Sequence, residues 1–402
     1  MSWILAVLTG LALGLLLWQW FEAIRFPLHR RKVAAGFAPG LTLLKPLKGA
    51  DSETEACLRS WLTLDYAGPV QVLFGVADAE DPAAAVVRRL QTEFPQADVE
   101  LVVCTGRLGP NSKVSKLAQL EPRARHTVLV VSDADVAVPP DFLAQLVQPF
   151  GEAGVGLVTP FYQLATPATA AMHWEALAVN ADFWSSVLQA VRLGPMRFAL
   201  GAVMAVRREV LQAIGGFGSL VHYLADDFEL GQRVTGRRPT ASPAEPGVVE
   251  GDRYRIAVCP VVVACRESPR GWGAIWRHQV RWARTIRHCQ PGPYALSVLS
   301  NPTLWPVLGV LAAPASVLAW TGLAVCLGTR LGMAAHCQAR LRRSWAHLRW
   351  VWLAPVKDLL GAVLWAWAFL GQTIEWRGER YRVRRGGRLE PLVGRVERVP
   401  AD

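Results

Sequence analysis

The chain has 402 residues, more than one ordinary domain core accommodates, so at least two structural parts are expected. An apolar fraction of 52%, a charged fraction of 19% and 17 Trp residues exceed the apolar content of an average soluble protein. The net charge of +11 favours an anionic partner; because much of the basic excess lies beside apolar segments, a membrane surface is favoured over nucleic acid. Seven scattered cysteines without a Cys-x-x-Cys pair argue against a disulfide framework or a zinc site and fit a reduced compartment.

The first apolar segment runs from Ile4 to Ala23, close to the ~20 residues that a membrane-spanning helix needs. A secretory signal peptide is the alternative, but no basic residue precedes the run and no small-residue cleavage site follows it. The basic stretch Arg25–Lys32 comes next and, by the positive-inside rule, faces the cytoplasm. Residues 1–24 are therefore predicted to be an uncleaved transmembrane anchor with its N-terminus outside.

Residues 41 to about 265 are predicted to form a soluble α/β domain. Apolar strand-like runs alternate with helix-like segments, an order typical of a largely parallel sheet with right-handed crossovers. The predicted strands are Leu41–Lys48, Val70–Ala77, Val99–Cys104 and Val128–Val131. The predicted helices are Ser52–Leu64, Pro82–Phe94 and Pro140–Phe150.

The fourth predicted strand is Val-rich, as expected of a strand buried on both faces, and it ends in Ser132-Asp-Ala-Asp135. Ligands of open α/β sheets bind at the carboxyl ends of strands. Asp133 and Asp135 lie two residues apart and would share one face of an extended segment. Two carboxylates suit a hard divalent cation that also holds a diphosphate. A solvated turn is the alternative, since Asp is a common turn residue.

Two further polar motifs lie between the predicted strands. Asp78 and Asp81 follow the second strand, where carboxylates can accept hydrogen bonds from a nucleotide's base or ribose. Capping of the helix that begins at Pro82 is the alternative and accounts for at least one of them. Lys113, in the stretch Asn111–Lys116, could meet a phosphate as a compact point charge, or simply belong to an exposed polar helix start.

Two motifs in the second half of the chain carry further candidates. Asp226 and Asp227 stand at an expected helix start; they could cap it, or one of them could serve as a catalytic base, and their adjacency does not say which. His278, Arg281 and Trp282 share one face of a predicted helix. That face could place a cation and a ring against a diphosphate and an acceptor, or contact anionic lipid headgroups.

The C-terminal third is rich in apolar and basic residues. Trp305–Leu327 is long enough to span a membrane, Arg330–Arg349 is Arg-rich, and Trp350–Ile374 is apolar apart from Lys357 and Asp358, which could pair with each other. If both apolar segments span, the Arg-rich stretch faces outward, against the positive-inside rule. An interfacial or re-entrant arrangement is therefore the alternative.

From about Leu43 to Arg287, and weakly through the C-terminal tail, the order of motifs resembles family 2 type inverting glycosyltransferases. The resemblance is closest to the ceramide glucosyltransferase-like branch, which includes hopanoid-associated bacterial enzymes. Each motif alone is weak, but this many in order make a specific signal. The matching stretches are Leu44–Gly49, Val76–Asp78 with Asp81-Pro82, Asn111–Lys113, Ser132–Asp135, Gly201 with Arg208–Gly216, Ala225–Asp227 and His278–Trp282.

The resemblance implies a GT-A fold, a Rossmann-like α/β catalytic domain with a mixed, mostly parallel sheet, flanked by N- and C-terminal transmembrane or interfacial helices. It implies that Asp78 contacts the uridine of the donor and that Lys113 lies near the nucleotide. It also implies that Asp133 and Asp135 bind the diphosphate and a divalent cation, Mg or Mn, with Asp135 as the preferred direct ligand.

On the acceptor side, the resemblance implies that Asp227 deprotonates the acceptor hydroxyl. Arg281 and Trp282 match the Arg-Trp of the last family motif. That motif usually begins with Gln or Arg, whereas this chain has His278, which makes a pH-sensitive contact to phosphate or acceptor conceivable. A His that the animal ceramide enzymes carry upstream of the Gly201 region has no counterpart between Asn180 and Phe198 of this chain.

The expected protein is a membrane-bound glycosyltransferase that moves glucose or N-acetylglucosamine from a UDP-sugar to a ceramide- or hopanoid-like lipid, with no nucleic-acid partner. A multi-pass protein of a bacterial inner membrane, with its catalytic domain in the cytoplasm, is expected. The alternatives are a processive polysaccharide synthase and a non-catalytic nucleotide-binding scaffold. The expected parts are an anchor at 1–24, the GT-A domain at 41–290, a membrane region at 300–376 and a basic cytosolic tail at 377–402.

Overall fold

The computed structural model describes residues 3–31, 36–236, 254–376 and 379–392. The chain forms two compact units. The sheet unit comprises Pro27–Thr166 and Gly194–Ser268, and the helical unit comprises Met1–Phe26, Pro167–Leu193 and Pro269–Asp402. The expected catalytic segment 41–290 is thus divided between the units, because residues 167–193 and 269–290 form helices that pack with the apolar helices.

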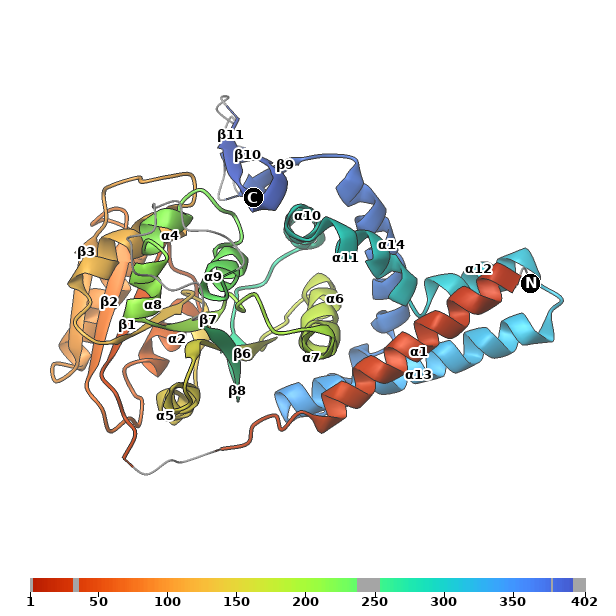
Figure 1. Ribbon diagram of the computed structural model, residues 1–402, viewed down its shortest axis with the longest axis horizontal. Coiled ribbons are helices and arrows are strands. Elements are labelled where there is room, and N and C mark those ends of the chain that lie inside the picture. The colour runs from red at the N-terminus through yellow and green to blue at the C-terminus, as the bar shows by residue number, and fades with distance from the viewer. Residues whose placement is uncertain (1–2, 32–35, 237–253, 377–378, 393–402) are drawn as a thin grey trace. The chain divides into compact units, whose positions relative to one another are not determined.

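The centre of the sheet unit is an eight-stranded sheet with the strand order β3-β2-β1-β4-β7-β6-β8-β5 (Figure 1). The pairs β1–β2, β1–β4, β2–β3 and β6–β8 are parallel, and β4–β7, β6–β7 and β5–β8 are antiparallel. The predicted mixed, mostly parallel sheet is therefore confirmed. The strands are β1 (Leu41–Pro46), β2 (Val70–Val76), β3 (Asp98–Val103), β4 (Val128–Ser132), β5 (Val136–Ala137), β6 (Val155–Leu164), β7 (Val203–Arg207) and β8 (Arg255–Cys265).

Apolar side chains cover both faces of the central strands. β4 is buried along its whole length, as its Val-rich sequence predicts. Leu43 of β1 packs in the core on one face of the sheet and its neighbour Leu44 in the core on the other, because side chains alternate along a strand. The first core also contains residues of α2, α3 and α5, and the second contains residues of α4, α8 and α9. Both faces of the strands are therefore covered by helices.

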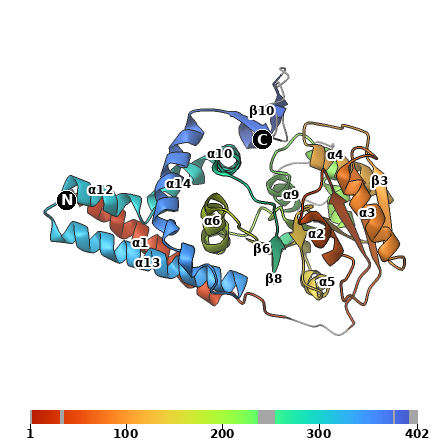
Figure 2. The same ribbon diagram turned by 180° about the vertical axis from the view of Figure 1, so that it is seen from behind.

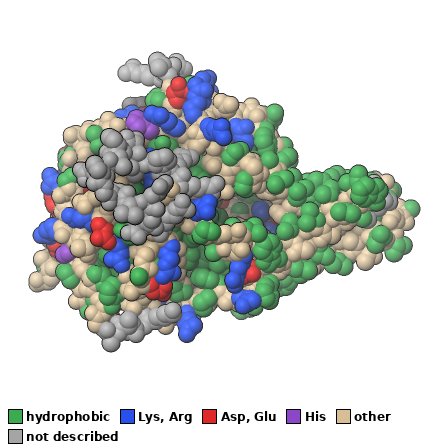
Figure 3. Space-filling view, in the orientation of Figure 1, with side chains coloured by type: hydrophobic (Ala, Val, Ile, Leu, Met, Phe, Trp, Pro, Cys, Tyr) green, Lys and Arg blue, Asp and Glu red, His purple; other side chains and the backbone are tan. Residues whose placement is uncertain are grey.

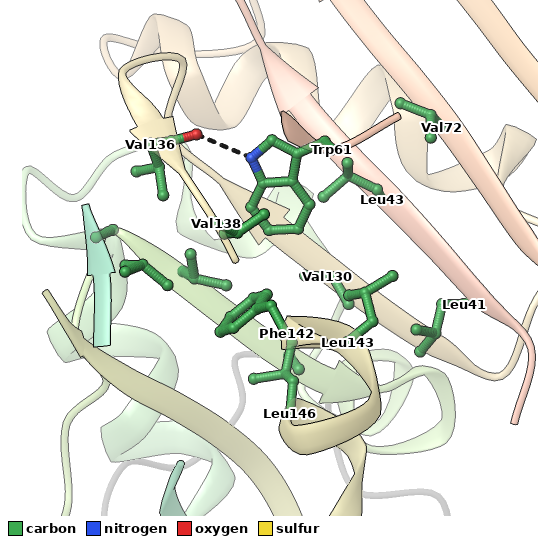
Figure 4. Packing of buried hydrophobic residues seen from close by; sticks show 14 of the residues in the cluster. Leu41, Leu43, Trp61, Val72, Val130, Val136, Val138, Phe142, Leu143 and Leu146 are labelled. Carbon is green, nitrogen blue, oxygen red and sulfur yellow. Dashed lines mark hydrogen bonds between the residues drawn. The ribbon is translucent and has the colours of Figure 1, made fainter. Parts of the chain in front are cut away.

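The helices of the sheet unit follow the predicted order, with shorter spans at two places. The segment expected as Pro140–Phe150 is α5 followed by a short 3-10 turn, and Ser52–Leu64 shortens to α2. In the core of the first face, Trp61 packs edge-on against Phe142 and its Nε1 donates to the Val136 carbonyl at 2.9 Å (Figure 4). The helices are α2 (Thr54–Ser60), α3 (Pro82–Glu93), α4 (Ser112–Leu120), α5 (Phe142–Val147), α8 (Arg208–Ala213) and α9 (Asp226–Val234).

In the helical unit, α1 runs alongside α13, with α12 next to it, in both ribbon views (Figures 1 and 2). Within the described residues, α1 and α13 are long and apolar enough to cross a membrane. The stretch Pro291–Ser300 and α12 would add a third span if this pair, bent by 54°, acts as one. The helices are α1 (Trp3–Arg25), α6 (Ala170–Leu177), α7 (Trp184–Leu193), α10 (Trp272–Cys289), α11 (Pro291–Leu296), α12 (Leu304–Ala312), α13 (Val317–Arg342) and α14 (Leu353–Phe369), with a π-helical turn, η3 (Ala178–Phe183), between α6 and α7.

The apolar stretch expected to span from Trp305 to Leu327 is not one helix. It breaks between α12 and α13, where Pro314 interrupts the run and the Ser316 side chain caps the next helix by accepting from Ala319 N at 3.3 Å. α13 then continues into the stretch expected to be an Arg-rich connection. α14, within the second predicted apolar segment, has only 17 residues.

α13 carries one arginine, Arg330, in its buried part, and two carboxylates compensate its charge. Its side chain is only 1% exposed, with Nη1 2.9 Å from Asp182 and Nε 2.8 Å from Asp358. Lys357 Nζ lies 2.6 Å from Asp182 and 3.3 Å from Asp358, so the suggested Lys357–Asp358 pair forms within a larger network. Two cations and two carboxylates compensate one another, which makes burial of these charges tolerable.

Large apolar side chains on α1, α12 and α13 remain exposed, and hydrophobic atoms cover much of the visible surface over these helices (Figure 3). Such a contiguous apolar surface marks a contact with lipid or protein. Beyond α14, a short antiparallel sheet with the order β11-β10-β9 forms from β9 (Thr373–Trp376), β10 (Glu379–Val383) and β11 (Leu389–Pro391). This small sheet was not predicted, because the segment after Trp376 was interpreted only as a basic tail.

Candidate active site

The predicted site residues divide between the two units. The sheet unit holds Asp78, Lys113, Asp133, Asp135 and Asp227. The helical unit holds His278, Arg281 and Trp282, all on α10.

Asp133 and Asp135 lie in a tight turn between β4 and β5. Val136 N donates to the Asp133 carbonyl at 3.4 Å, which closes the turn, and Asp133 N donates to the Ala202 carbonyl at 3.1 Å. The expectation of an extended segment was therefore wrong at this point, and the turn alternative describes the backbone. The turn still keeps the two carboxylates close enough for the charge of Asp133 to raise the pKa of Asp135.

The Asp135 carboxyl is buried beside a second carboxylate. Burial, and then the neighbouring Asp133 carboxylate, raise the pKa of Asp135 to about 6. Among the described residues, no ion pair to Asp135 is found. The charges of Lys45 and Lys113 oppose this shift only in part, and a carboxylate with a raised pKa and no ion pair is a suitable ligand for an added cation.

Lys113 is the cation at the centre of the carboxylate cluster. Its Nζ lies 2.8 Å from Asp133 Oδ1 and 3.3 Å from Asp226 Oδ2. Burial alone lowers the pKa of Lys113, but the carboxylates of Asp133 and Asp226 outweigh it and hold the pKa above its usual range. Lys113 is therefore a charged and buried link between the end of β4 and the start of α9.

Asn111 places Lys113 by capping α4. Its Oδ1 accepts from the backbone N of Lys113 and of Val114, each at 3.1 Å, and its Nδ2 donates to the Tyr223 carbonyl at 2.8 Å. The cap thus also ties the start of α4 to the segment just before α9. The alternative that this motif is a helix start is therefore confirmed. Its expected exposure was wrong, because both Asn111 and Lys113 are buried.

Asp227 differs from its neighbour Asp226 in its environment. Its Oδ1 accepts from Phe228 N at 2.7 Å, and no ion pair to it is found in the described part of the chain. Burial, and then the negative charge of Asp226, raise the pKa of Asp227 to about 7. Asp226 is paired with Lys113, whereas Asp227 is poised to gain or lose a proton near neutral pH.

Gly201 lies against the Asp227 carboxylate. A Cβ on Gly201 would come within 2.9 Å of Asp227 Oδ2. The turn around Gly201 is held by Thr159 of β6, whose Oγ1 accepts from Leu200 N at 3.1 Å and lies 2.9 Å from the Val203 carbonyl oxygen. The same turn contains the Ala202 carbonyl that binds Asp133 N, so it links the two acidic motifs.

Asp78 is exposed at the carboxyl end of β2, and its Oδ1 accepts from Glu80 N at 3.0 Å. Because β2, β1 and β4 are parallel neighbours, Asp78 and Asp133 lie at the same edge of the sheet with β1 between them. Asp81 has a structural role as expected, because its Oδ1 caps α3 at Ala83 N, 2.9 Å away.

In the helical unit, His278 packs against the Trp282 ring with a centroid separation of 4.6 Å, in keeping with the predicted shared helix face. Its Nδ1 lies 2.6 Å from Oε1 of Glu175, a residue of α6. Gln279 Nε2 donates to the same oxygen at 2.9 Å, and Arg270 Nη2 donates to Glu175 Oε2 at 2.9 Å. The motif is therefore anchored to α6 by one carboxylate.

Comparison with known proteins identifies the family. The sequence profile described as glycosyl transferase family 21 matches residues 3–389. The chain belongs to glycosyltransferase family 21. It is similar to ceramide glucosyltransferase 3 of Caenorhabditis elegans, with 20% identity over 389 residues, or 91% of this chain and 78% of the relative. It is also similar to the ceramide glucosyltransferase of Candida albicans, with 31% identity over 108 residues, or 24% of this chain but only 20% of that relative.

Among solved structures, a mannosyltransferase from Pyrobaculum calidifontis, in complex with GDP-Man and Mn²⁺, is similar at a TM-score of 0.48. Its identity is 21%, over 89% of this chain and 98% of that chain. The resemblance of this family 21 glycosyltransferase to the ceramide glucosyltransferase branch, inferred from the order of its motifs, is confirmed by the family match.

Lys45 of this family 21 chain was missed as a site residue. It is fully buried in β1, and its Nζ donates to Ser132 Oγ at 2.9 Å and to the Asp133 carbonyl at 2.7 Å. The ammonium also lies 4.8 Å from the centroid of the Trp61 ring, and burial lowers the pKa of Lys45 to about 8. A lysine within an apolar strand is the signal that could have revealed it, since buried lysines need partners.

Substituting Gly201→Ala should impair catalysis without unfolding the protein. The new methyl group displaces a carboxylate that can rotate, so we expect kcat to fall about 10- to 100-fold while the melting temperature stays near the wild-type value. Gly151→Ala is the matched control, because a Cβ there meets nothing within 4 Å. Equal kcat values for Gly201→Ala and the wild type would show that the Asp227 position does not limit turnover.

Proposed function

We propose that this family 21 protein is a membrane-bound inverting glycosyltransferase. It moves glucose or N-acetylglucosamine from a UDP-sugar to the hydroxyl of a ceramide- or hopanoid-like lipid. One observation carries the proposal: Lys113 forms ion pairs with Asp133 and Asp226, whereas Asp227 and Asp135 have no ion pair among the described residues and keep raised pKa values. One of these two carboxyls is thus available as a base and the other as a metal ligand.

In the proposed reaction, Asp227 takes the proton of the acceptor hydroxyl as the hydroxyl oxygen attacks the anomeric carbon. The new C–O bond forms as the bond from the anomeric carbon to the diphosphate oxygen breaks, and the diphosphate keeps the electron pair. This single displacement inverts the anomeric carbon and needs no carboxylate nucleophile. A pKa of about 7 suits a base that works near neutral pH.

The residues at the end of β4 fit a divalent cation. Within the described residues no group of three or more His, Cys, Asp or Glu side chains gathers around a point, so the protein would supply only Asp135 and Asp133. Mg²⁺ is commonly held in this way, by one or two carboxylates together with substrate phosphates. When bound, the cation neutralises charge on the departing diphosphate. Asp135 is the preferred ligand, because Lys113 already occupies one oxygen of Asp133.

The remaining site residues would bind substrates. Asp78 is proposed to contact the uridine from the same sheet edge, and its exposure leaves it accessible. Lys113 is proposed to serve the donor site through the carboxylates that it orients. His278, Arg281 and Trp282 are proposed to contact the acceptor or the diphosphate from α10.

A lipid acceptor agrees with the composition of the helical unit. α1 and α13 are candidate spans, and their exposed apolar side chains suit a bilayer. We propose a multi-pass protein of a bacterial inner membrane with the sheet unit in the cytoplasm, where UDP-sugars are available and where the basic residues after α1 favour that side. A processive polysaccharide synthase is disfavoured, because two or three candidate spans in the described residues are few for an export channel.

The proposed function is tested by assaying the purified protein in lipid nanodiscs with a panel of UDP-sugars. Ceramide, a hopanoid and diacylglycerol serve as acceptors, and mass spectrometry detects the products. We expect one hexose or N-acetylhexosamine to be added to one lipid class. A ladder of products with many sugars would favour the processive alternative, and binding of UDP without any product would favour the scaffold alternative.

Removal of divalent cations should stop glycosyl transfer. Without a cation, the diphosphate departs next to Asp133 and Asp135 with its charge uncompensated, so we expect activity to fall at least about 100-fold with EDTA and to return with Mn²⁺ or Mg²⁺. Calcium-saturated EDTA is the control for effects of the chelator itself. Transfer that continues in EDTA-treated, metal-free buffer would remove the cation from the mechanism.

The rate of transfer should depend on pH through Asp227. The base acts as a carboxylate, and its raised pKa of about 7 means that the active form is lost as pH falls below that value. We expect kcat/KM to decrease about tenfold per pH unit on the acid side and to level off above it. Asp226→Asn should move this acid limb to lower pH, because it removes the negative charge that helps to raise the Asp227 pKa. If Asp226→Asn leaves the acid side of the pH profile unchanged, the titrating group is a residue other than Asp227.

A further inference from the structure

The carboxylate of Glu175 uses both of its oxygens to hold the start of α10. The side chain is only 1% exposed, so its charge must be compensated within the protein. Arg270 meets Oε2 at 2.9 Å, while His278 Nδ1 and Gln279 Nε2 meet Oε1 at 2.6 and 2.9 Å. One buried carboxylate therefore orients the first two residues of the His278–Trp282 motif.

Burial of the imidazole and the nearby arginine charges determine the protonation state of His278. An arginine is always charged in proteins, so Arg270 already compensates the charge of Glu175. His278 therefore does not have to carry a proton on both nitrogens to provide that compensation. Within the described part of the chain, the charged groups that act on His278 are Glu175, Arg281 and Arg270. Burial lowers the pKa of His278, the two arginines lower it further, and Glu175 only partly opposes them. The imidazole is therefore neutral at neutral pH.

A neutral imidazole carries a single N–H, and the hydrogen bond to Glu175 determines where it is. Burial raises the pKa of Glu175, but the hydrogen-bonding and electrostatic interactions with His278, and then the charge of Arg270, outweigh it and keep Glu175 ionised. A carboxylate can only accept, so the proton of this 2.6 Å contact belongs to Nδ1. The opposite nitrogen, Nε2, then has a lone pair, which accepts a hydrogen bond from a hydroxyl and repels a phosphate oxygen.

We propose that Glu175 is a positioning residue that keeps the proton of His278 on Nδ1, so that Nε2 accepts a hydrogen bond from a substrate hydroxyl rather than binding phosphate. This inference rests on the proposed function, since it assigns the chemistry of one contact in that site. The hydroxyl can belong to the lipid acceptor or to the sugar of the donor. The Trp282 ring, 4.6 Å from the imidazole, gives that contact an apolar neighbour.

Nitrogen-15 NMR of histidine-labelled protein in lipid bilayers tests the proton position directly. The chain has 8 histidines, and the His278 signals are assigned by their loss in His278→Gln. At about pH 7.5 we expect a neutral imidazole with the proton on Nδ1, because this pH lies above the usual histidine pKa. An imidazolium, or a proton on Nε2, would overturn the inference. This measurement needs no turnover, so it stands even if no UDP-sugar and lipid pair proves to be a substrate.

A double-mutant cycle separates positioning from a merely structural role. In Glu175→Gln, we expect a mixture of His278 tautomers and a roughly tenfold rise in the KM of the substrate that offers the hydroxyl, the value of about one hydrogen bond. A rise confined to the lipid KM assigns the hydroxyl to the acceptor, and one confined to the UDP-sugar KM assigns it to the donor. In a His278→Gln background, Glu175→Gln should change that KM by less than twofold, because an amide has no tautomers to select. Equal effects in both backgrounds would overturn the proposal.

Discussion

Asp227→Asn should abolish glycosyl transfer while the protein stays folded and still binds UDP. The amide cannot take the acceptor proton, so kcat should fall about 1,000-fold, within the usual contribution of a general base. The fold should survive for two reasons. The Asn oxygen can still accept from Phe228 N, and a carboxyl with a pKa of about 7 is already partly uncharged at neutral pH.

The control for this substitution is Asp65→Asn, which makes the same chemical change at an exposed position of the sheet unit and should leave kcat unchanged. UDP binding, measured by calorimetry, should agree within about twofold between Asp227→Asn and the wild type. If Asp227→Asn turns over at the wild-type rate, the base is another residue. If it loses UDP binding as well, Asp227 serves the donor site.

Lys113→Met should destabilise the sheet unit and remove activity. The substitution keeps the length of the side chain but leaves Asp133 and Asp226 without their cation. Breaking a buried ion pair by removing one partner typically costs about 3–5 kcal/mol; because the Asp133 side chain is 40% exposed, we expect about 3 kcal/mol. The melting temperature in nanodiscs should fall accordingly.

A second substitution shows whether unpaired charge is the cause. Adding Asp226→Asn to Lys113→Met removes the more buried of the two orphaned carboxylates and should restore much of the lost stability. Activity should stay low, because Asp133 is still without its partner. A Lys113→Met protein that melts with the wild type, or a double variant that is no more stable than Lys113→Met, would contradict the proposed role of Lys113.

Local sequence patterns were sufficient to predict β1, β2, β3 and β4, whereas β5 to β8 were not predicted. The Val-rich run of β4 predicts a strand buried on both faces, and its burial agrees. The order of strands and helices likewise predicts the parallel half of the sheet. The motif Ser132–Asp135 marks the end of β4, although the aspartates turn out to lie in a turn instead of an extended segment.

Contacts between distant parts of the chain could not be predicted from local patterns. Lys45 reaches the Asp133 carbonyl across 88 positions of sequence, and Glu175 meets His278 across 103 positions. The lysine in an apolar strand indicates that Lys45 needs a partner, but only the packing of β1 beside β4, or of α6 beside α10, shows which residue the partner is. For the same reason, the adjacency of Asp226 and Asp227 did not show which of the two pairs with Lys113.

The membrane region was the least predictable. Hydropathy predicts one continuous membrane-spanning helix over Trp305–Leu327, because it measures apolar character and not the helix break at Pro314. It also counts Arg330 against a span, although Asp182 and Asp358 compensate its charge within the helical unit. Buried charge pairs therefore change which stretch of an apolar sequence becomes a long helix.

The stereochemistry of the product shows whether transfer proceeds by the single displacement proposed for Asp227. With Asp227 as base and no covalent intermediate, a single displacement on an α-linked UDP-sugar yields a β-linked glycolipid. Proton NMR of the lipid product, made by wild-type protein in nanodiscs, reads the anomeric configuration from the coupling constant. We expect only a β-linked product from the wild-type protein and no product from Asp227→Asn. An α-linked product would require two displacements or a different mechanism and would contradict the assignment of Asp227.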